Sequence, residues 1–237
     1  MKRFVHIIII FFIAFSTSGF GQEEDERENV KYTHDFRFID GIYMNFEQVK
    51  QNAPLPKYKI LTNADYHDPE FFDKVLKNDV LYYFDDNATR NEILLEDIWG
   101  YSRNGVLYIK IGGDFNRITI LGGICHFVGT VTVTDTRYVD PYYNRYNPYG
   151  YNSYNYYNNF YSPQRATTYS RTEMKQFILD FETGKVMDYN SGNLEIALMR
   201  DPELHDEYSL LKSKERKQLK FVYIRKFNER NPVYFPK

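Results

Sequence analysis

The chain has 237 residues, with 30 Lys and Arg against 32 Asp and Glu, so its formal net charge is −2 at pH 7. This near balance gives no electrostatic support for nucleic-acid binding, which favours a strongly basic domain. The length suits one domain, or one domain with an appendage. The single cysteine, Cys125, cannot form an internal disulfide, so the fold has to be held by its core.

Residues 1–21 have the three-part pattern of a secretory signal peptide: a cationic start, an apolar run over 4–15, and small residues that include Gly19 and Gly21. The apolar run is shorter than the roughly 20 residues that a membrane-spanning helix needs. We therefore expect cleavage near Gly21, with an uncleaved anchor as the alternative, and no transmembrane helix after cleavage. Residues 22–35 are charged and aperiodic, and we expect them to form an acidic flexible tail.

The lone cysteine also bears on the compartment. Small exported animal domains tend to be dense in disulfides, whereas an exported chain without an internal disulfide suits a bacterial envelope better. The sequence therefore favours export to a bacterial envelope.

Residues 36–237 are expected to form a single α+β domain that begins with short elements. Residues 42–46 are typical of a short strand. Asn45, with Gln48 three residues later, is typical of a capping box that opens a short helix, which Pro54 would end. The further expectations for this part are a strand over 57–61, a second short helix from Asp68 and Pro69, and a buried strand over the apolar run 80–84.

The segment from 98 to 134 gives the clearest local signal, which is that of an antiparallel meander. Asn104-Gly105 separates two apolar runs, and this dipeptide favours a type I′ hairpin turn because both central residues need positive φ. Gly112-Gly113 and Gly122-Gly123 mark two further turns. The strands are therefore expected over 98–111 with a turn at Asn104-Gly105, over 115–121, and over 124–134.

Residues 138–165 interrupt this pattern because they consist almost entirely of Tyr, Asn, Pro, Ser and Gly. A segment of this composition has no periodic apolar face to bury. We expect it to be a long loop inserted between two paired strands. The second of these strands would run over 172–181 and turn at 182–185 into another strand over 186–188.

The C-terminal part is predicted to be helical. Asp201 is a suitable N-cap, Pro202 suits the first helical position, and apolar residues recur at helical spacing up to Phe227. A break over 212–220 is possible, and Asn231-Pro232 would end the helix. The predicted fold class is α+β: an antiparallel, largely meandering β-sheet with short N-terminal helices and a long C-terminal helix packed on it.

Three motifs lie at turns and strand starts of this predicted domain. They are Asp40-Gly41-Ile42-Tyr43 with Asn45-Phe46-Glu47 and Pro54, Ile98-Trp99-Gly100-Tyr101 with Asn104-Gly105-Val106-Leu107-Tyr108-Ile109, and Tyr223-Ile224-Arg225-Lys226-Phe227-Asn228 with Asn231-Pro232. Together they resemble a family of exported Gram-negative bacterial proteins, and the resemblance spans most of the mature chain. The family has no assigned activity, so the resemblance implies no catalytic residue. It implies export to the periplasm, or to the cell surface or medium, of a Gram-negative bacterium.

Cysteine and histidine side chains are the first candidates for chemistry. Cys125 and His126 are adjacent in a predicted strand, so they point to opposite faces and cannot form a dyad with each other. Cys125 shares its parity with Phe127 and is expected to be a buried, small hydrophobic side chain. None of the isolated histidines has the spacing of paired metal ligands: His34, His67, His126 and His205. We therefore expect neither a metal nor a cofactor.

Calcium is a second possibility, because ligand types stand at calcium-loop spacing at Asp85, Asn87, Thr89, Asn91 and Glu96. Arg90 occupies the position that needs glycine, and the residues before Asp85 are typical of a strand instead of a helix. An ordinary polar loop is therefore favoured.

Two groups of charged residues leave alternatives open. The carboxylates Glu92, Glu96, Asp97 and Asp114 lie near predicted strand ends, where a glycan hydrolase could place an acid and a base. The basic stretch is typical of the solvated side of a helix, with contact to anionic lipid or polysaccharide as the alternative; it comprises Lys212, Lys214, Arg216, Lys217 and Lys220.

The Tyr/Asn-rich loop is the main candidate for a binding surface. Tyrosine offers a large rigid face with a polar tip at low entropic cost, so it suits stacking on sugars or docking on a protein. A variable insert without a partner is the alternative. The tyrosines concerned are Tyr142, Tyr143, Tyr146, Tyr149, Tyr151, Tyr154, Tyr156 and Tyr157. The sequence predicts an exported, non-enzymatic envelope or secreted protein that binds an envelope protein or polysaccharide, with a glycan-directed hydrolase as the alternative.

Overall fold

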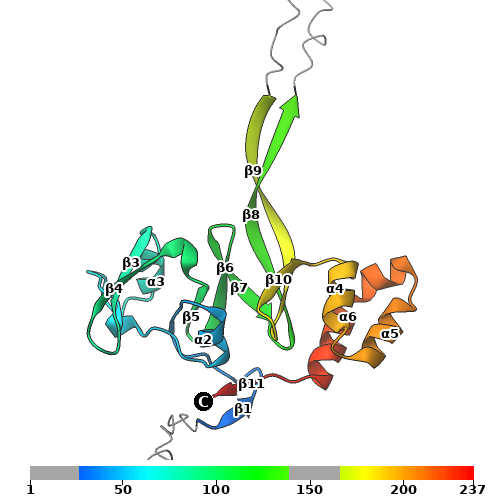
Figure 1. Ribbon diagram of the computed structural model, residues 1–237, viewed down its shortest axis with the longest axis horizontal. Helices are drawn as coiled ribbons and strands as arrows, with labels where there is room; N and C mark the ends of the chain where they lie inside the picture. The colour runs from blue at the N-terminus through cyan, green and yellow to red at the C-terminus, as the bar shows by residue number, and fades with distance from the viewer. Residues whose placement is uncertain (1–26, 139–165) are drawn as a thin grey trace, which may run out of the picture.

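The computed structural model describes residues 27–138 and 166–237, which form a mixed α and β structure around a large curled antiparallel sheet (Figure 1). The sheet has seven strands in the order β10-β9-β8-β7-β6-β5-β2. The strands are β2 Gly41–Tyr43, β5 Gly100–Arg103, β6 Val106–Ile111, β7 Asp114–Ile120, β8 Ile124–Tyr138, β9 Ala166–Asp180 and β10 Lys185–Asp188. Strands β5 to β8 pair in chain order, so the predicted antiparallel meander is confirmed.

The turn between β5 and β6 has the backbone that its dipeptide predicts. Asn104 and Gly105 have φ values of 54° and 74°, as a type I′ turn requires. The carboxylate of Asp40 accepts hydrogen bonds from both backbone N–H groups at 3.0 Å. The turn is therefore fixed by local conformation and by a side chain from the segment before β2.

Strands β8 and β9 are the longest in the described chain, and they pair from Ile124–Asp180 to Tyr138–Ala166. This confirms the predicted pairing of the strands on either side of the Tyr/Asn-rich segment. Neighbouring strands reach only their lower part, because β7 pairs with β8 at His126 and Phe127 and β10 pairs with β9 below Gln176. Residues 130–138 and 166–175 project from the body as a two-stranded ribbon, which we call the arm (Figure 1).

The remaining described strands form two small two-stranded sheets. The first joins β1 Asn29–Lys31 to β11 Tyr234–Pro236, so residues that were assigned to the flexible tail lie in a paired strand beside the chain's other end. The second joins β3 Val80–Phe84 to β4 Arg90–Leu94. The strand predicted over 80–84 is therefore present, but its burial was predicted wrongly, because Tyr82 and Phe84 are 36% and 38% exposed.

The described residues contain five α-helices: α2 Phe46–Lys50, α3 Phe71–Val75, α4 Ser191–Leu198, α5 Pro202–Ser209 and α6 Ser213–Arg230. The Asn45 side chain accepts the Gln48 N–H at the start of α2, as the capping pattern predicts. The stretch expected to form one helix from Pro202 is two helices that meet at 210–212. Residues 57–61, predicted as a strand, contain a 3-10 turn at Lys57–Lys59, and only Ile60 bridges to β3.

Three apolar clusters hold these parts together. The central cluster lies on one face of the sheet and includes Cys125 and Phe127. Helices α4, α5 and α6 cover the opposite face over Ile124 and Ile178. The third cluster joins α3, β3 and β4 to β5, and it forms the lobe on the far side of the sheet from α4–α6 (Figure 1). Over residues 27–138 and 166–237, the structure has no helix with the length and apolarity needed to cross a membrane.

Candidate functional site

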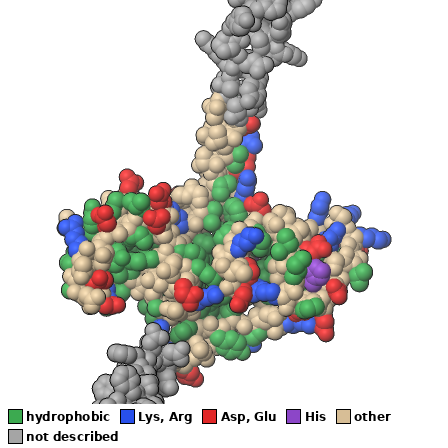
Figure 2. All heavy atoms as spheres, in the orientation of Figure 1, with side chains coloured by type: hydrophobic (Ala, Val, Ile, Leu, Met, Phe, Trp, Pro, Cys, Tyr) green, Lys and Arg blue, Asp and Glu red, His purple; other side chains and the backbone are tan. Residues whose placement is uncertain are grey.

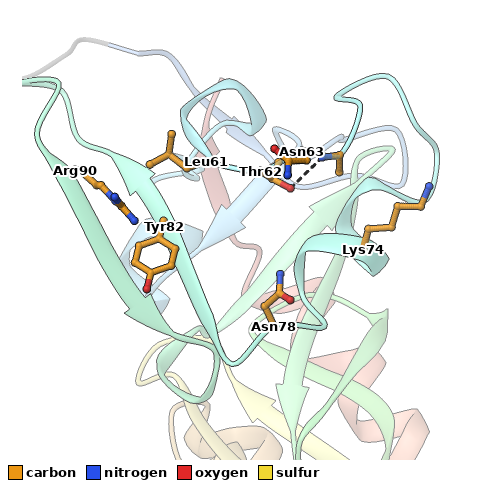
Figure 3. A pocket seen from close by; sticks show the side chains of 8 residues that line it. Leu61, Thr62, Asn63, Lys74, Asn78, Tyr82 and Arg90 are labelled. Carbon is orange, nitrogen blue, oxygen red and sulfur yellow. Dashed lines mark hydrogen bonds between the residues drawn. The ribbon is translucent and has the colours of Figure 1, made fainter.

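An open groove of about 770 Å³ lies beside the β3–β4 hairpin (Figure 3). Three segments that are separate in the sequence line it: the stretch after the 3-10 turn, the end of α3 with the following turn, and the hairpin. Its lining residues are Leu61, Thr62, Asn63, Ala64, Lys74, Asn78, Tyr82 and Arg90. The lining is thus mainly amide, hydroxyl and cationic groups around one aromatic ring, and none of these eight side chains is acidic.

The alternation of β3 explains why Tyr82 faces the groove. Leu81 and Tyr83 pack toward α3 in the third apolar cluster, so Tyr82 points to the other face of the hairpin. The backbone C=O of Tyr82 accepts the Leu61 N–H at 2.8 Å, which places the stretch 61–64 along the edge of β3. The groove is therefore formed on a hydrogen-bonded strand and not on a free loop.

The hairpin turn is fixed by Asp85. Its carboxylate accepts the N–H groups of Asn87 at 2.9 Å and Thr89 at 2.8 Å, and the side-chain amide of Asn91 at 3.1 Å. These bonds, the Thr89 N–H first, hold the pKa of Asp85 below its ordinary value. The Asp85 oxygens thus serve a polar turn, which agrees with the interpretation favoured over a calcium loop. Glu96 lies after β4, in a 3-10 turn.

Two cations border the groove. The Arg90 guanidinium lies over the Tyr82 ring, 4.6 Å from its centroid, so the two side chains form one stacked surface. Lys74 pairs with Asp68, and this hydrogen bond raises the pKa of Lys74 above its ordinary value. Lys74 therefore carries its positive charge at neutral pH. The visible face of the whole body carries basic and acidic side chains intermixed (Figure 2).

A second, smaller hollow of about 400 Å³ lies at the base of the arm. It brings together two carboxylates, Asp73 of α3 and Asp114 of β7, although only Asp114 was singled out from the sequence. Asp73 accepts a hydrogen bond from Arg103 at 2.8 Å. The other carboxylates that the sequence suggested, Glu92, Glu96 and Asp97, lie outside the lining of this hollow.

Cys125 and His126 lie on opposite faces of β8, as predicted. Cys125 is fully buried in the central cluster and its thiol donates to the Gly122 C=O at 3.3 Å. Burial raises the pKa of Cys125 to about 12, so the thiol is neutral and inert at pH 7. His126 packs against the rings of Tyr189 and Phe221, with centroids 4.9 Å and 4.7 Å away.

The basic stretch 212–220 begins at Lys212, the N-cap of α6, and continues along the first turns of that helix. Two of its side chains are directed at the body: Arg216 pairs with Glu195 at 2.9 Å, and Lys220 donates to the Tyr189 C=O at 3.0 Å. Among the described residues there is no group of three or more His, Cys, Asp and Glu that could hold a metal ion. Three other histidines, His34, His67 and His205, each contact an aspartate one or two residues away. These three pairs lie in separate parts of the chain.

The eight tyrosines from Tyr142 to Tyr157 that the sequence favoured for binding lie outside the described residues. The groove at the hairpin was missed by the sequence analysis. The run 80–84 is apolar throughout, without polar alternation, so nothing in the sequence indicated that Tyr82 faces out of the core. Asn63, Lys74 and Asn78 carried no signal, because only the fold brings them to the hairpin.

Comparison with known proteins adds no assignment. No protein-family model matches the chain, no curated protein matches its sequence, and no solved structure matches its fold.

Proposed function

We propose that this chain is an exported, non-enzymatic binding protein, located in the bacterial envelope or secreted, and that the groove beside β3 and β4 holds a glycan partner with acidic groups. The N-terminal signal pattern supports export. The observation that supports the binding site is the Tyr82–Arg90 stack, which stands in an open groove beside Asn63, Asn78 and Lys74.

The chemistry of this lining suits a sugar chain. An aromatic ring on a rigid strand offers an apolar face for the C–H surface of a sugar, while amide side chains donate to and accept from its hydroxyl groups. Arg90 and Lys74 can pair with carboxylate or phosphate substituents, for which arginine has the suitable planar geometry. The open shape also fits a long polymer that passes through, instead of a small enclosed ligand.

The direct test is binding of the purified mature chain to envelope polysaccharides and acidic oligosaccharides, measured by calorimetry. Tyr82→Ala should weaken binding about fivefold, since one stacked ring contributes on the order of 1 kcal/mol. The matched control is Tyr58→Ala, because Tyr58 is 72% exposed and does not line the groove. Equal affinity of the two variants would remove the groove from the proposal.

The Tyr/Asn-rich segment remains a proposed second contact with the partner. Deleting residues 142–161 should lower the affinity for a large envelope partner in a cross-linked pull-down while Tyr82-dependent oligosaccharide binding persists. If the deletion leaves the recovered partners unchanged, the tyrosines have no part in binding.

A hydrolase remains the second candidate because Asp73 and Asp114 line one hollow. A pair of carboxylates is the usual apparatus of glycoside hydrolysis. Incubation with envelope polysaccharides and analysis of released reducing ends would show this activity, and Asp114→Asn should abolish it. Release that survives this substitution would exclude the pair.

A further inference from the structure

Among residues 27–138 and 166–237, no strand pairs with the outer edge of β9 in the arm. The Tyr189 N–H donates to the Gln176 C=O at 2.9 Å, so Gln176 directs its backbone groups away from β8. Because these directions alternate along a strand, Ser170, Thr172 and Met174 direct their N–H and C=O groups to the same outer edge. Strand β10 covers this edge only from Phe177 to Asp180.

An uncovered edge on a two-stranded ribbon is a site for pairing with another strand. Two strands alone are marginally stable in water, and an additional paired strand stabilises them. The arm is also rich in β-branched residues, with Val131, Thr132, Val133 and Thr134 in β8. The arm therefore has the backbone and the composition for β-augmentation.

We propose that two copies of this chain form a dimer through the β9 edges of their arms, in an antiparallel pair related by a two-fold axis, with Thr172 opposite Thr172 of the second copy. The paired segment is 169–175, and the two arms together form a four-stranded sheet. This inference is independent of the proposed glycan function, because the groove lies on β3 and β4.

The charges of β9 select the second copy as the partner. In this register, Arg171 lies opposite Glu173 of the second copy, and Glu173 lies opposite Arg171 of the second copy. These are non-hydrogen-bonded positions, where opposing side chains are closest. Within one chain Arg171 and Glu173 already lie on the same face, 2.7 Å apart. Dimerisation thus joins two ion pairs into a network of four alternating charges.

The other two-fold registers are poorer. Centring the pair on residue 171 or 173 places like charges opposite each other, which is destabilising. A shift outward to Ser170 places Arg171 opposite Tyr169 and leaves Glu173 without a cation. A shift inward to Met174 takes the second strand to Phe177, where β10 already pairs. Centring on Met174 would still place Lys175 opposite Glu173 of the second copy, so the position of β10 decides against Met174, while charge decides against the other centres. Together they favour Thr172.

Charge reversal provides the decisive experiment. The mature chain should sediment as a dimer in analytical ultracentrifugation at low salt. Arg171→Glu and Glu173→Arg each place like charges across both pairs, so each variant alone should raise the dimer dissociation constant roughly tenfold or more. An equimolar mixture of the two single variants restores opposite charges in both pairs, and so does the double variant within one chain. Both should dimerise like the original chain.

A cysteine cross-link tests the register. In a hydrogen-bonded antiparallel pair the opposing Cα atoms are about 5.5 Å apart, which suits a disulfide. Thr172→Cys should therefore cross-link two copies under mild oxidation. Thr132→Cys is the matched control, because Thr132 lies directly across β8–β9 from Thr172. In the proposed dimer the two Thr132 positions are three strand spacings apart, roughly 14 Å, and should not cross-link.

The possible outcomes separate clearly. Loss of the dimer in each single variant, with recovery on mixing, together with the cross-link at residue 172 alone, supports the proposal. A monomeric wild-type chain at high concentration, failure of the mixture to recover, or cross-linking through residue 132 instead would overturn it. Circular dichroism of each variant shows whether it is folded, and Arg171 and Glu173 lie outside all three apolar clusters.

Discussion

Replacing Asn228 with alanine should destabilise the chain strongly, because its side chain completes the edge of β8. The Asn228 carboxamide accepts the Ile124 N–H at 2.8 Å and donates to the Ile124 C=O at 2.9 Å. Strand β7 ends at Ile120, and the turn at Gly122 and Gly123 leads into β8. The amide of Asn228 on α6 therefore takes the place of a strand at the first residue of β8.

The size of the effect follows from two backbone groups that lose their partner. Ile124 is fully buried, so water cannot replace the amide without a rearrangement. Each unsatisfied buried group costs about 1–3 kcal/mol, and two groups lose their partner, which predicts a loss of about 2–6 kcal/mol for Asn228→Ala. Asn228→Asp keeps the acceptor but loses the donor to Ile124. The aspartate variant should therefore also lose stability, through one unpaired carbonyl and its repulsion from the carboxylate.

Urea unfolding of the mature chain at neutral pH would measure both losses. The control is Asn87→Ala in the exposed β3–β4 turn, which should change the free energy of unfolding by less than about 0.5 kcal/mol. If Asn228→Ala were as stable as this control, the amide would not substitute for a strand, and the reasoning about the β8 edge would be wrong.

Three further outcomes are expected. Gly184→Ala should lower the free energy of unfolding by about 1–3 kcal/mol more than Gly113→Ala. Both glycines have positive φ, but of the two only Gly184 would bring a Cβ against another residue, 2.5 Å from the Phe46 ring. Cys125 should resist thiol reagents in the folded chain and react after unfolding, since burial raises its pKa to about 12. Burial lowers the pKa of His126, so the unfolded state takes up the proton first as pH falls below 6.5. The free energy of unfolding should therefore fall on acidification, and His126→Gln should lose that part of the pH dependence. The groups that face this imidazole are Thr119, Gln176, Tyr189, Lys220 and Phe221.

The central sheet could be predicted because its signals are local. The turn at Asn104-Gly105 and the glycine pairs determine where strands β5 to β8 reverse, whatever the rest of the chain does. The pairing of β8 with β9 also followed, because apolar alternation resumes after the Tyr/Asn-rich segment. In these cases a short stretch of sequence contains both the turn and the residues that pair.

The missed features depend on partners far away in the chain. Strand β1 has no apolar alternation of its own and exists because β11 pairs with it. Asn52 accepts the Ile39 N–H and the Tyr43 hydroxyl, and its amide donates to Pro236 near the C-terminus. The groove likewise draws on three separate segments. Such sites are products of tertiary packing, so residue type and spacing alone could not predict them.

The groove and the arm make one joint prediction about long polysaccharides. A dimer presents two grooves. A polymer that reaches both should therefore bind more tightly than a short oligosaccharide, by about a hundredfold. Arg171→Glu should therefore weaken binding to the polymer while leaving the affinity for a short oligosaccharide unchanged. Tyr82→Ala should weaken both. Calorimetry with a size series of one glycan measures this difference. If Arg171→Glu weakened short-chain binding as well, the arm and not the groove would contain the binding site. If it changed neither, the two grooves would not act on one polymer.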